Sequence, residues 1–219
     1  MNNSIIVLYK MNKKIRIILW DFGGVLTDSP IKNFLKYENK YNIPPGTIIK
    51  INSHNKLNNA WAKLEKNQIN KNTFIKLFLE EAKELKIKDK LDVEEILECL
   101  DVKLNKDMVD FFLKIKNKIQ FACLTNNISE SINSKANKTF KSFSQHFSNV
   151  FESSKIGLRK PEIKIYKHVI AKLEVNPENI LFIDDLGINL KPARSLGMHT
   201  YKMINTQNTK DFLSDFLEI

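Results

Sequence analysis

Residues 15–28 read Ile15-Arg16-Ile17-Ile18-Leu19-Trp20-Asp21-Phe22-Gly23-Gly24-Val25-Leu26-Thr27-Asp28. The segment begins as an almost unbroken apolar run, which is typical of a strand buried on both faces of a parallel sheet. Two glycines follow Asp21 within three residues, and they allow the backbone to turn sharply and bring its amides close to a bound anion. We therefore expect Asp21 at the carboxyl end of a central strand, where open α/β sheets place their chemistry. Taken alone, the segment fits a plain strand and turn with a capping Asp equally well.

Two later apolar runs also end in polar residues. Residues 119–124 lead into Thr125 and Asn126, and residues 180–183 lead into Asp184 and Asp185. Strands that alternate with helical patterns indicate a parallel sheet covered on both faces. Because the carboxyl ends of parallel strands share one edge, we expect these polar groups to converge with the Asp of the first strand. The predicted fold class is α/β, with a Rossmann-like parallel sheet as its core.

Residues 29–103 are expected to form an α-helical cap inserted after the first strand. Their apolar residues recur at helical spacing, as in Leu57, Trp61 and Leu64, and no segment among them has a convincing strand pattern. Such stripes most often reflect simple helix packing. Their position matters more, because a helical block inserted directly after the glycine-rich strand end would cover that end like a lid.

The remaining domain assignment follows from the cap. We assign residues 14–28 and 104–219 to the α/β core. Residues 1–13 are expected to be an N-terminal extension, either loosely ordered or the product of a start codon set before Met11. No internal repeat or low-complexity linker is evident.

The formal net charge of +10 invites a nucleic-acid interpretation. Among the 35 basic residues, however, only Arg16, Arg159 and Arg194 are arginines, and phosphodiester recognition tends to use arginine forks. The lysines are scattered among many Asn and Ile residues, as an AT-rich coding bias produces. We therefore expect no nucleic-acid partner. A general attraction for anions would still help to bring in a small phosphorylated metabolite.

Composition and missing motifs exclude several other classes. Cys99 and Cys123 form no CxxC pair, so we expect neither a disulfide framework nor a zinc site. This use of cysteine fits a reducing compartment, and we expect a cytoplasmic location. No apolar run approaches the roughly 20 residues that span a bilayer, so no membrane partner is expected. The chain has no GxxxxGK[ST], GxSxG or HExxH motif, which argues against a P-loop nucleotidase, a serine hydrolase and a zinc protease.

The converging polar groups suit chemistry on a phosphate. Carboxylates from two strands can hold Mg²⁺, which favours oxygen ligands and keeps water and substrate phosphate in its shell. A hydroxyl, an amide and a lysine can bind the remaining phosphate oxygens. Lys160 precedes Pro161, which we expect to start a helix because proline favours the first turn. With metal and lysine offsetting the repulsion between two anions, Asp21 would be free to attack phosphorus.

Four short motifs follow one another along the chain. They are Asp21-Phe22-Gly23-Gly24-Val25-Leu26, Leu124-Thr125-Asn126, Gly157-Leu158-Arg159-Lys160-Pro161-Glu162 and Ile183-Asp184-Asp185-Leu186-Gly187-Ile188-Asn189. Together they resemble the signatures of the haloacid dehalogenase-like (HAD) superfamily, specifically the subgroup that contains the phosphatase domain of soluble epoxide hydrolases. The resemblance covers nearly the whole chain from about residue 14, including the helical cap.

The resemblance implies roles for the residues that would meet the phosphate. Asp21 matches the nucleophile of the first signature. Thr125 and Asn126 match the second signature and should bind the phosphoryl group. Lys160 matches the lysine that stabilises charge in the family.

The resemblance also implies a Mg²⁺ site. Asp185 matches the direct carboxylate ligand, with Asp184 supporting it and Asp21 sharing the ion. By the same similarity, Gly23 would give a backbone carbonyl to Mg²⁺. Asn189 would orient the acidic loop.

One position departs from the family pattern. Most family phosphatases carry a second Asp two residues after the nucleophile, as general acid for the leaving group and then as base for water. This chain has Gly23 there, and losing a positioned acid–base group typically costs roughly 10²–10⁴-fold in rate. Asp28 is the nearest spare carboxylate, although a structural role in the hinge is the simpler interpretation. His54 in the cap is a second possible substitute, although a lone His in a lysine-rich segment is usually a surface residue.

Three functions fit these residues. The first is a Mg²⁺-dependent phosphatase that acts on a small organic phosphate through an aspartyl-phosphate on Asp21. The second is a HAD-fold protein that binds a phosphorylated ligand or partner and turns over little, because Gly23 replaces the acid–base group. The third is a haloacid dehalogenase, which the acidic pair Asp184-Asp185 disfavours because that chemistry needs no metal. The substrate and the oligomeric state do not follow from the sequence.

Overall fold

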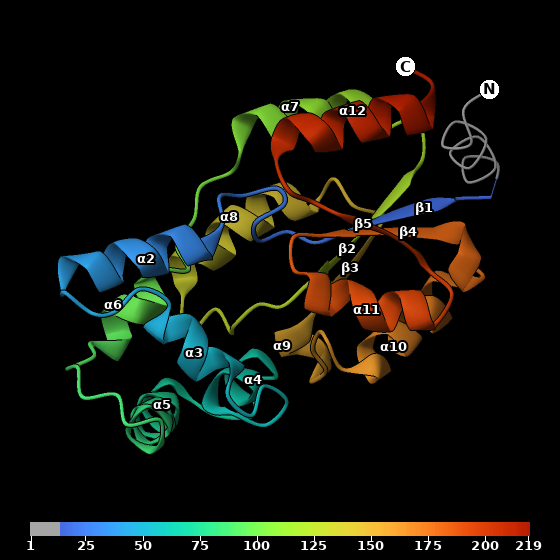
Figure 1. Ribbon diagram of the computed structural model, residues 1–219. Coiled ribbons are helices and arrows are strands. Elements are labelled where there is room, and N and C mark those ends of the chain that lie inside the picture. Colours follow the sequence, from blue (N-terminus) through green and yellow to red (C-terminus); the bar gives the residue numbers. More distant parts are fainter. Residues whose placement is uncertain (1–13) are drawn as a thin grey trace.

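The computed structural model describes residues 14–219, and the expected extension over residues 1–13 lies outside them. Its centre is a sheet of five parallel strands in the order β3-β2-β1-β4-β5. The strands are β1 (Ile17–Trp20), β2 (Gln120–Thr125), β3 (Asn149–Glu152), β4 (Ile180–Asp184) and β5 (His199–Lys202). Helices cover both faces (Figure 1). The predicted Rossmann-like α/β class is therefore confirmed.

Side chains of the central strand alternate between two hydrophobic clusters, as the two-residue period of a strand requires. Ile18 and Trp20 belong to the cluster beneath α7, α8 and α12, whereas Ile17 and Leu19 belong to the cluster beneath α10 and α11. Figure 1 shows α7 and α12 lying side by side on one face. The helices of the core are α7 (Lys106–Ile115), α8 (Ser134–Ser144), α9 (Ser153–Ile156), α10 (Ile163–Leu173), the short 3₁₀ helix η1 (Pro177–Asn179), α11 (Gly187–Ser195) and α12 (Thr206–Leu217).

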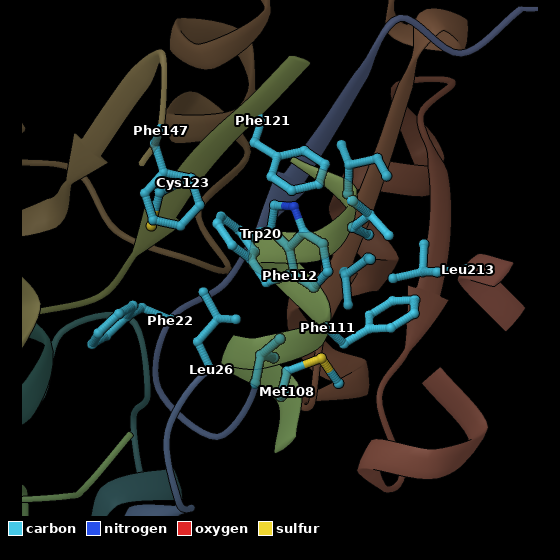
Figure 2. Packing of buried hydrophobic residues seen from close by; sticks show 14 of the residues in the cluster. Trp20, Phe22, Leu26, Met108, Phe111, Phe112, Phe121, Cys123, Phe147 and Leu213 are labelled. Atoms are coloured by element: carbon cyan, nitrogen blue, oxygen red, sulfur yellow. The ribbon is translucent and has the colours of Figure 1, made fainter. Parts of the chain in front are cut away.

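Aromatic rings fill the first of these clusters. Phe112 of α7 is fully buried, and its ring centroid lies 5.3 Å from that of Trp20 and 4.7 Å from that of Phe121. Phe147 approaches the same ring at 5.2 Å (Figure 2). Such edge-on and tilted contacts are favourable beyond the area they bury. They fix β1, and with it the strand end that carries Asp21.

Five of the six helices between β1 and β2 form a cap, whose hydrophobic cluster also includes Ile128 from the segment after β2 (Figure 1). Its chain leaves and returns through a narrow hinge, where Thr27 and Leu104 pair as an isolated antiparallel bridge. Asp28 N donates to the Lys103 carbonyl at 2.9 Å beside this bridge. The exact domain boundaries stay a prediction. The cap helices are α2 (Pro30–Lys40), α3 (Thr47–Ser53), α4 (Ala60–Glu65), α5 (Lys71–Glu84) and α6 (Val93–Glu98).

Two local features complete the fold. The expected helix start at Pro161 is wrong, because α10 begins at Ile163 with Glu162 in extended conformation before it, and the Lys160-Pro161 peptide bond is cis. The backbone of Lys160 is instead tied to the residue that follows β2, which keeps this segment out of the helix. None of the helices in residues 14–219 is both long enough and apolar enough to span a membrane.

Candidate active site

Three carboxylates meet at the carboxyl ends of the two central strands. Asp21 directly follows β1, Asp184 is the last residue of β4, and Asp185 follows it. One carboxylate oxygen from each lies within 4.8 Å of the other two. The sheet order places β2 and β3 on one side of β1 and β4 and β5 on the other, so this is the point at which open α/β sheets bind ligands.

Lys160 reaches this cluster from the loop before α10. Its Nζ lies 2.8 Å from Asp21 Oδ1 and 2.7 Å from Asp184 Oδ2, and its side chain is 1% exposed. Burial opposes the lysine charge, but Asp184 and Asp21 outweigh it and raise the pKa of Lys160 above its usual value. The lysine is therefore a fixed positive charge beside the predicted nucleophile.

Asp21 is buried, with one oxygen engaged and the other open. Its Oδ1 accepts from Lys160 Nζ and from the Phe22 backbone N–H at 2.7 Å. Within residues 14–219, Oδ2 accepts no hydrogen bond from another group. Burial raises the pKa of Asp21 well above its usual value, although Lys160 opposes this shift. An oxygen without a partner in such a place is free to meet a ligand.

Charge balance at this cluster calls for a cation. Three carboxylates face one lysine, and burial, followed by the charge of Asp184, raises the pKa of Asp185 to about 6. Buried anions in excess are costly unless a cation compensates them. The cluster offers oxygen atoms only, which suits Mg²⁺ better than zinc or copper. The residues present therefore fit the predicted metal.

The two adjacent acids differ in their hydrogen bonds. Asp184 Oδ1 accepts from the Leu186 N–H at 2.8 Å and from Asn189 Nδ2 at 3.0 Å, while its Oδ2 accepts from Lys160. Asn189 Nδ2 thus donates to both oxygens of Asp184, and its role in orienting the acidic loop stays a prediction. With Asp184 occupied in this way, Asp185 is the acid better placed to meet a cation.

The two glycines after the nucleophile have different surroundings. Gly24 has a φ of +75°, and a Cβ added there would lie 2.4 Å from Asp185 Oδ2. A larger residue here would have to displace the Asp185 carboxylate and would adopt a φ that glycine tolerates best. A Cβ added at Gly23 would meet nothing within 4 Å, so the position of the missing family Asp is open space.

Of the other predicted site residues, Thr125 and Asn126 lie at the end of β2 near the carboxylates, whereas Asp28 and His54 lie away from them. Thr125 is buried at the end of β2 and lines a small cavity of about 110 Å³ together with Gly23 and Asn126. The Asn126 side chain contacts the Lys160 backbone, and its predicted contact with phosphate stays a prediction. Asp28 is exposed in the hinge and does not line the cavity beside the nucleophile. His54 is exposed and lines a separate cavity on the cap.

A larger cavity of about 440 Å³ lies between core and cap. The core contributes Asp21, Lys160 and Asp185, and the cap contributes Phe34, Trp61 and Glu65 among others. The cavity is thus charged at the strand ends, whereas the cap lines it with apolar side chains together with polar and charged ones.

Three charged residues at this cavity were not among the predicted site residues: Lys56, Glu65 and Arg159. Glu65, at the end of α4, contacts Arg159 and Asn126. In the sequence Glu65 is one acid among many on a cap helix, and its partners lie 94 and 61 residues away. A single sequence holds no signal for such a contact. The helical spacing of Leu57, Trp61 and Leu64 predicted only which face of the helix is buried, and it gave no partner for Glu65.

A family model for haloacid dehalogenase-like hydrolases matches residues 15–197. The chain belongs to this family of hydrolases. It is 31% identical over 194 residues to acyl-CoA dehydrogenase family member 10 of Mus musculus, and the match covers 86% of the chain and 18% of that protein. It is 25% identical over 204 residues to bifunctional epoxide hydrolase 2 of Sus scrofa, covering 88% of the chain and 37% of that protein. The chain thus spans well under half the length of these relatives.

The HAD fold is also seen in solved structures. A HAD family enzyme from Bacteroides thetaiotaomicron, in complex with magnesium and inorganic phosphate, superposes with a TM-score of 0.57 at 24% identity. That alignment covers 86% of this chain and 93% of the other. The resemblance to HAD proteins, and to the epoxide hydrolase phosphatase subgroup, is therefore confirmed. The cap of this chain is consistent with the HAD fold.

Proposed function

We propose that this HAD hydrolase is a Mg²⁺-dependent phosphatase that acts on a small organic phosphate. The observation that carries the proposal is the position of Lys160 Nζ, 2.8 Å from Asp21 Oδ1, inside a cluster of three carboxylates. Lysine and cluster suit a dianionic phosphate held by a divalent cation. The Bacteroides thetaiotaomicron enzyme, which binds magnesium and phosphate, supports the same chemistry by analogy.

In the proposed reaction, the free oxygen Oδ2 of Asp21 forms a bond to phosphorus while the bond from phosphorus to the leaving oxygen breaks. Lys160 offsets the negative charge that the phosphoryl group brings beside Asp21. When bound by Asp21, Asp185 and the Gly23 carbonyl, Mg²⁺ would supply further positive charge against the phosphate oxygens. Water then attacks phosphorus, the bond to Asp21 breaks, and inorganic phosphate and the Asp21 carboxylate are released. Thr125 and Asn126 are proposed to hold the phosphoryl group.

The leaving oxygen needs a proton, and Gly23 has no side chain to give it. Alcohols with low pKa values leave without this help, whereas ordinary sugar or alkyl alcohols depend on it. We therefore expect faster turnover of activated esters than of alkyl phosphates. The apolar side chains that the cap contributes to the cavity, such as Phe34 and Trp61, would meet the organic part of the substrate and exclude bulk water.

The experiment that tests this proposal is a phosphatase assay with p-nitrophenyl phosphate and a panel of metabolite phosphates, with and without Mg²⁺. The phosphatase account predicts turnover that needs Mg²⁺ and disappears in Asp21→Asn. Metal-independent turnover, or turnover that survives in Asp21→Asn, would refute the account.

The second candidate is a HAD-fold protein that binds a phosphorylated ligand and turns over little. The open space at Gly23 favours it, because neither acid nor base occupies that position. Tight phosphate binding without turnover of any ester in the panel would support this candidate. The third candidate, dehalogenation, is tested by halide release from 2-chloropropionate without metal.

A further inference from the structure

Glu65 of the cap makes three hydrogen bonds to groups around the active site. Its Oε2 accepts from Arg159 Nε at 2.5 Å and from Asn126 Nδ2 at 3.0 Å. Its Oε1 accepts from the indole Nε1 of Trp61 at 3.1 Å. The Glu65 side chain is only 12% exposed. All three neighbours are donors, so only a group that accepts through both oxygens fits this place.

Asn126 carries this contact on to Lys160. Its Nδ2 donates both to Glu65 and, at 2.9 Å, to the Lys160 carbonyl, while its Oδ1 accepts from the Lys160 N–H at 2.9 Å. The Lys160 ammonium then contacts Asp21. A continuous chain of polar contacts therefore runs from the cap to the nucleophile.

We propose that Glu65 is a positioning residue: by holding Asn126 from the cap side, it fixes the backbone of Lys160 and so the ammonium beside Asp21. This inference rests on the proposed phosphatase function for its kinetic consequence. Cap and nucleophile are thereby linked through one carboxylate.

A second ion pair offers a matched control. Lys66, the residue after Glu65, lies 3.0 Å from Glu162, two residues beyond Lys160. The Lys66 and Glu162 side chains are 12% and 19% exposed. The Arg159 and Glu65 side chains are similarly buried, at 11% and 12% exposed. The Lys66 pair thus joins the end of the same cap helix to the same core segment without contacting Asn126. We expect its removal to weaken cap docking and to leave the contacts of Asn126 intact.

The test compares Glu65→Gln with Lys66→Gln. Gln keeps the size of Glu65 but turns one acceptor into an NH₂ donor, which must face one of the three donors around it. The first readout is hydrogen exchange of the Lys160 backbone amide, which depends on the bond to Asn126 and needs no activity. We expect it to speed up roughly 10-fold or more in Glu65→Gln and to stay within about 3-fold in Lys66→Gln.

The second readout is turnover of p-nitrophenyl phosphate with Mg²⁺. A small displacement of Lys160 should lower kcat of Glu65→Gln roughly 10- to 100-fold with little change in KM, while kcat of Lys66→Gln stays near that of the parent. Equal effects of the two variants, or unchanged exchange in Glu65→Gln, would overturn the proposal. If Glu65→Gln does not fold, Glu65→Asp replaces it in the comparison. Asp keeps the carboxylate but draws it back from Asn126, so the Lys160 amide must again exchange faster than in Lys66→Gln. A parent protein without turnover would refute the phosphatase function, and the exchange readout would still decide the role of Glu65.

Discussion

Asn126 and Lys160 are joined by two hydrogen bonds between a side-chain amide and a backbone: the Lys160 N–H donates to Asn126 Oδ1, and Asn126 Nδ2 donates to the Lys160 carbonyl, both at 2.9 Å. The pairing connects the end of β2 to the loop that carries the buried lysine. It explains how a residue in a loop keeps its ammonium on two carboxylates.

Replacing Asn126 should therefore reduce catalysis through Lys160. In Asn126→Leu both hydrogen bonds are lost at nearly constant size, and we expect kcat on p-nitrophenyl phosphate to fall roughly 10- to 100-fold. Inhibition by inorganic phosphate separates the positioning of Lys160 from direct binding of phosphate. A higher inhibition constant in the variant would indicate that Asn126 also binds phosphate. Asn127→Leu is the control, since Asn127 contacts Glu152 and Ser154 instead. An Asn126→Leu enzyme as fast as the control would contradict the positioning role.

Gly23→Asp should restore the missing acid. The added Cβ meets no atom within 4 Å, so the backbone position accepts a side chain without a clash at its Cβ. We expect kcat on alkyl phosphates to rise by 10-fold or more, within the roughly 10²–10⁴-fold range of such groups, and little change on p-nitrophenyl phosphate, whose leaving group needs no proton. Gly24→Ala is the contrasting variant, because its Cβ would collide with Asp185, and it should lower Mg²⁺ affinity. No gain on any alkyl phosphate in a folded Gly23→Asp would show that acid catalysis is not the limitation.

The stability of the metal-free protein should depend on the acidic cluster. Because burial raises the pKa of Asp185 from 3.8 to about 6, its contribution to the free energy of unfolding is fully present below pH 3.8 and is lost as the pH rises through 6. The loss amounts to at most about 3 kcal/mol, and the raised pKa of Asp21 adds to it in the same direction.

Mg²⁺ competes with protons for the same carboxylate oxygens. Its stabilisation of the fold should therefore increase as the pH rises and the carboxylates lose their protons. We expect Mg²⁺ to raise Tm more at pH 7.5 than at pH 5. Thermal unfolding with Mg²⁺ and with EDTA at both values measures this. Asp185→Asn should flatten the dependence. A Tm that responds to Mg²⁺ equally at both pH values would argue against a metal site on these carboxylates.

Phe112→Ala should destabilise the core without altering the active-site chemistry directly. The ring is fully buried and touches Trp20, Phe121 and Phe147 (Figure 2). Its removal leaves a cavity, and we expect the free energy of unfolding to fall by about 3–5 kcal/mol. Urea denaturation measures the change. A loss below about 1 kcal/mol would mean that the aromatic cluster is not packed as described.

The sequence predicted the core of this fold because buried parallel strands have a simple pattern. Every residue of β1 is apolar, as is every residue of β4 before Asp184, and both faces of the sheet are indeed covered. The same logic brought Asp21, Asp184 and Asp185 together, since parallel strands end at one edge. Asp28 did not join them, because the hinge uses its backbone and leaves its side chain in solvent.

Contacts between cap and core were beyond the reach of pattern analysis. The pairing of Glu65 with Arg159 joins residues whose local surroundings are ordinary amphipathic helix and loop. Only the packing of the cap on the core brings them together. The helix start expected at Pro161 failed for a related reason, because the tertiary contact of Lys160 with Asn126 outweighs the local preference of proline.

The most direct test of the central claim is mass spectrometry of the protein quenched in acid during turnover of p-nitrophenyl phosphate with Mg²⁺. The account predicts a phosphoryl group on the peptide that contains Asp21, absent without Mg²⁺ and absent in Asp21→Asn. Steady turnover with no phosphoryl group on Asp21, or with the group on another residue, would contradict it.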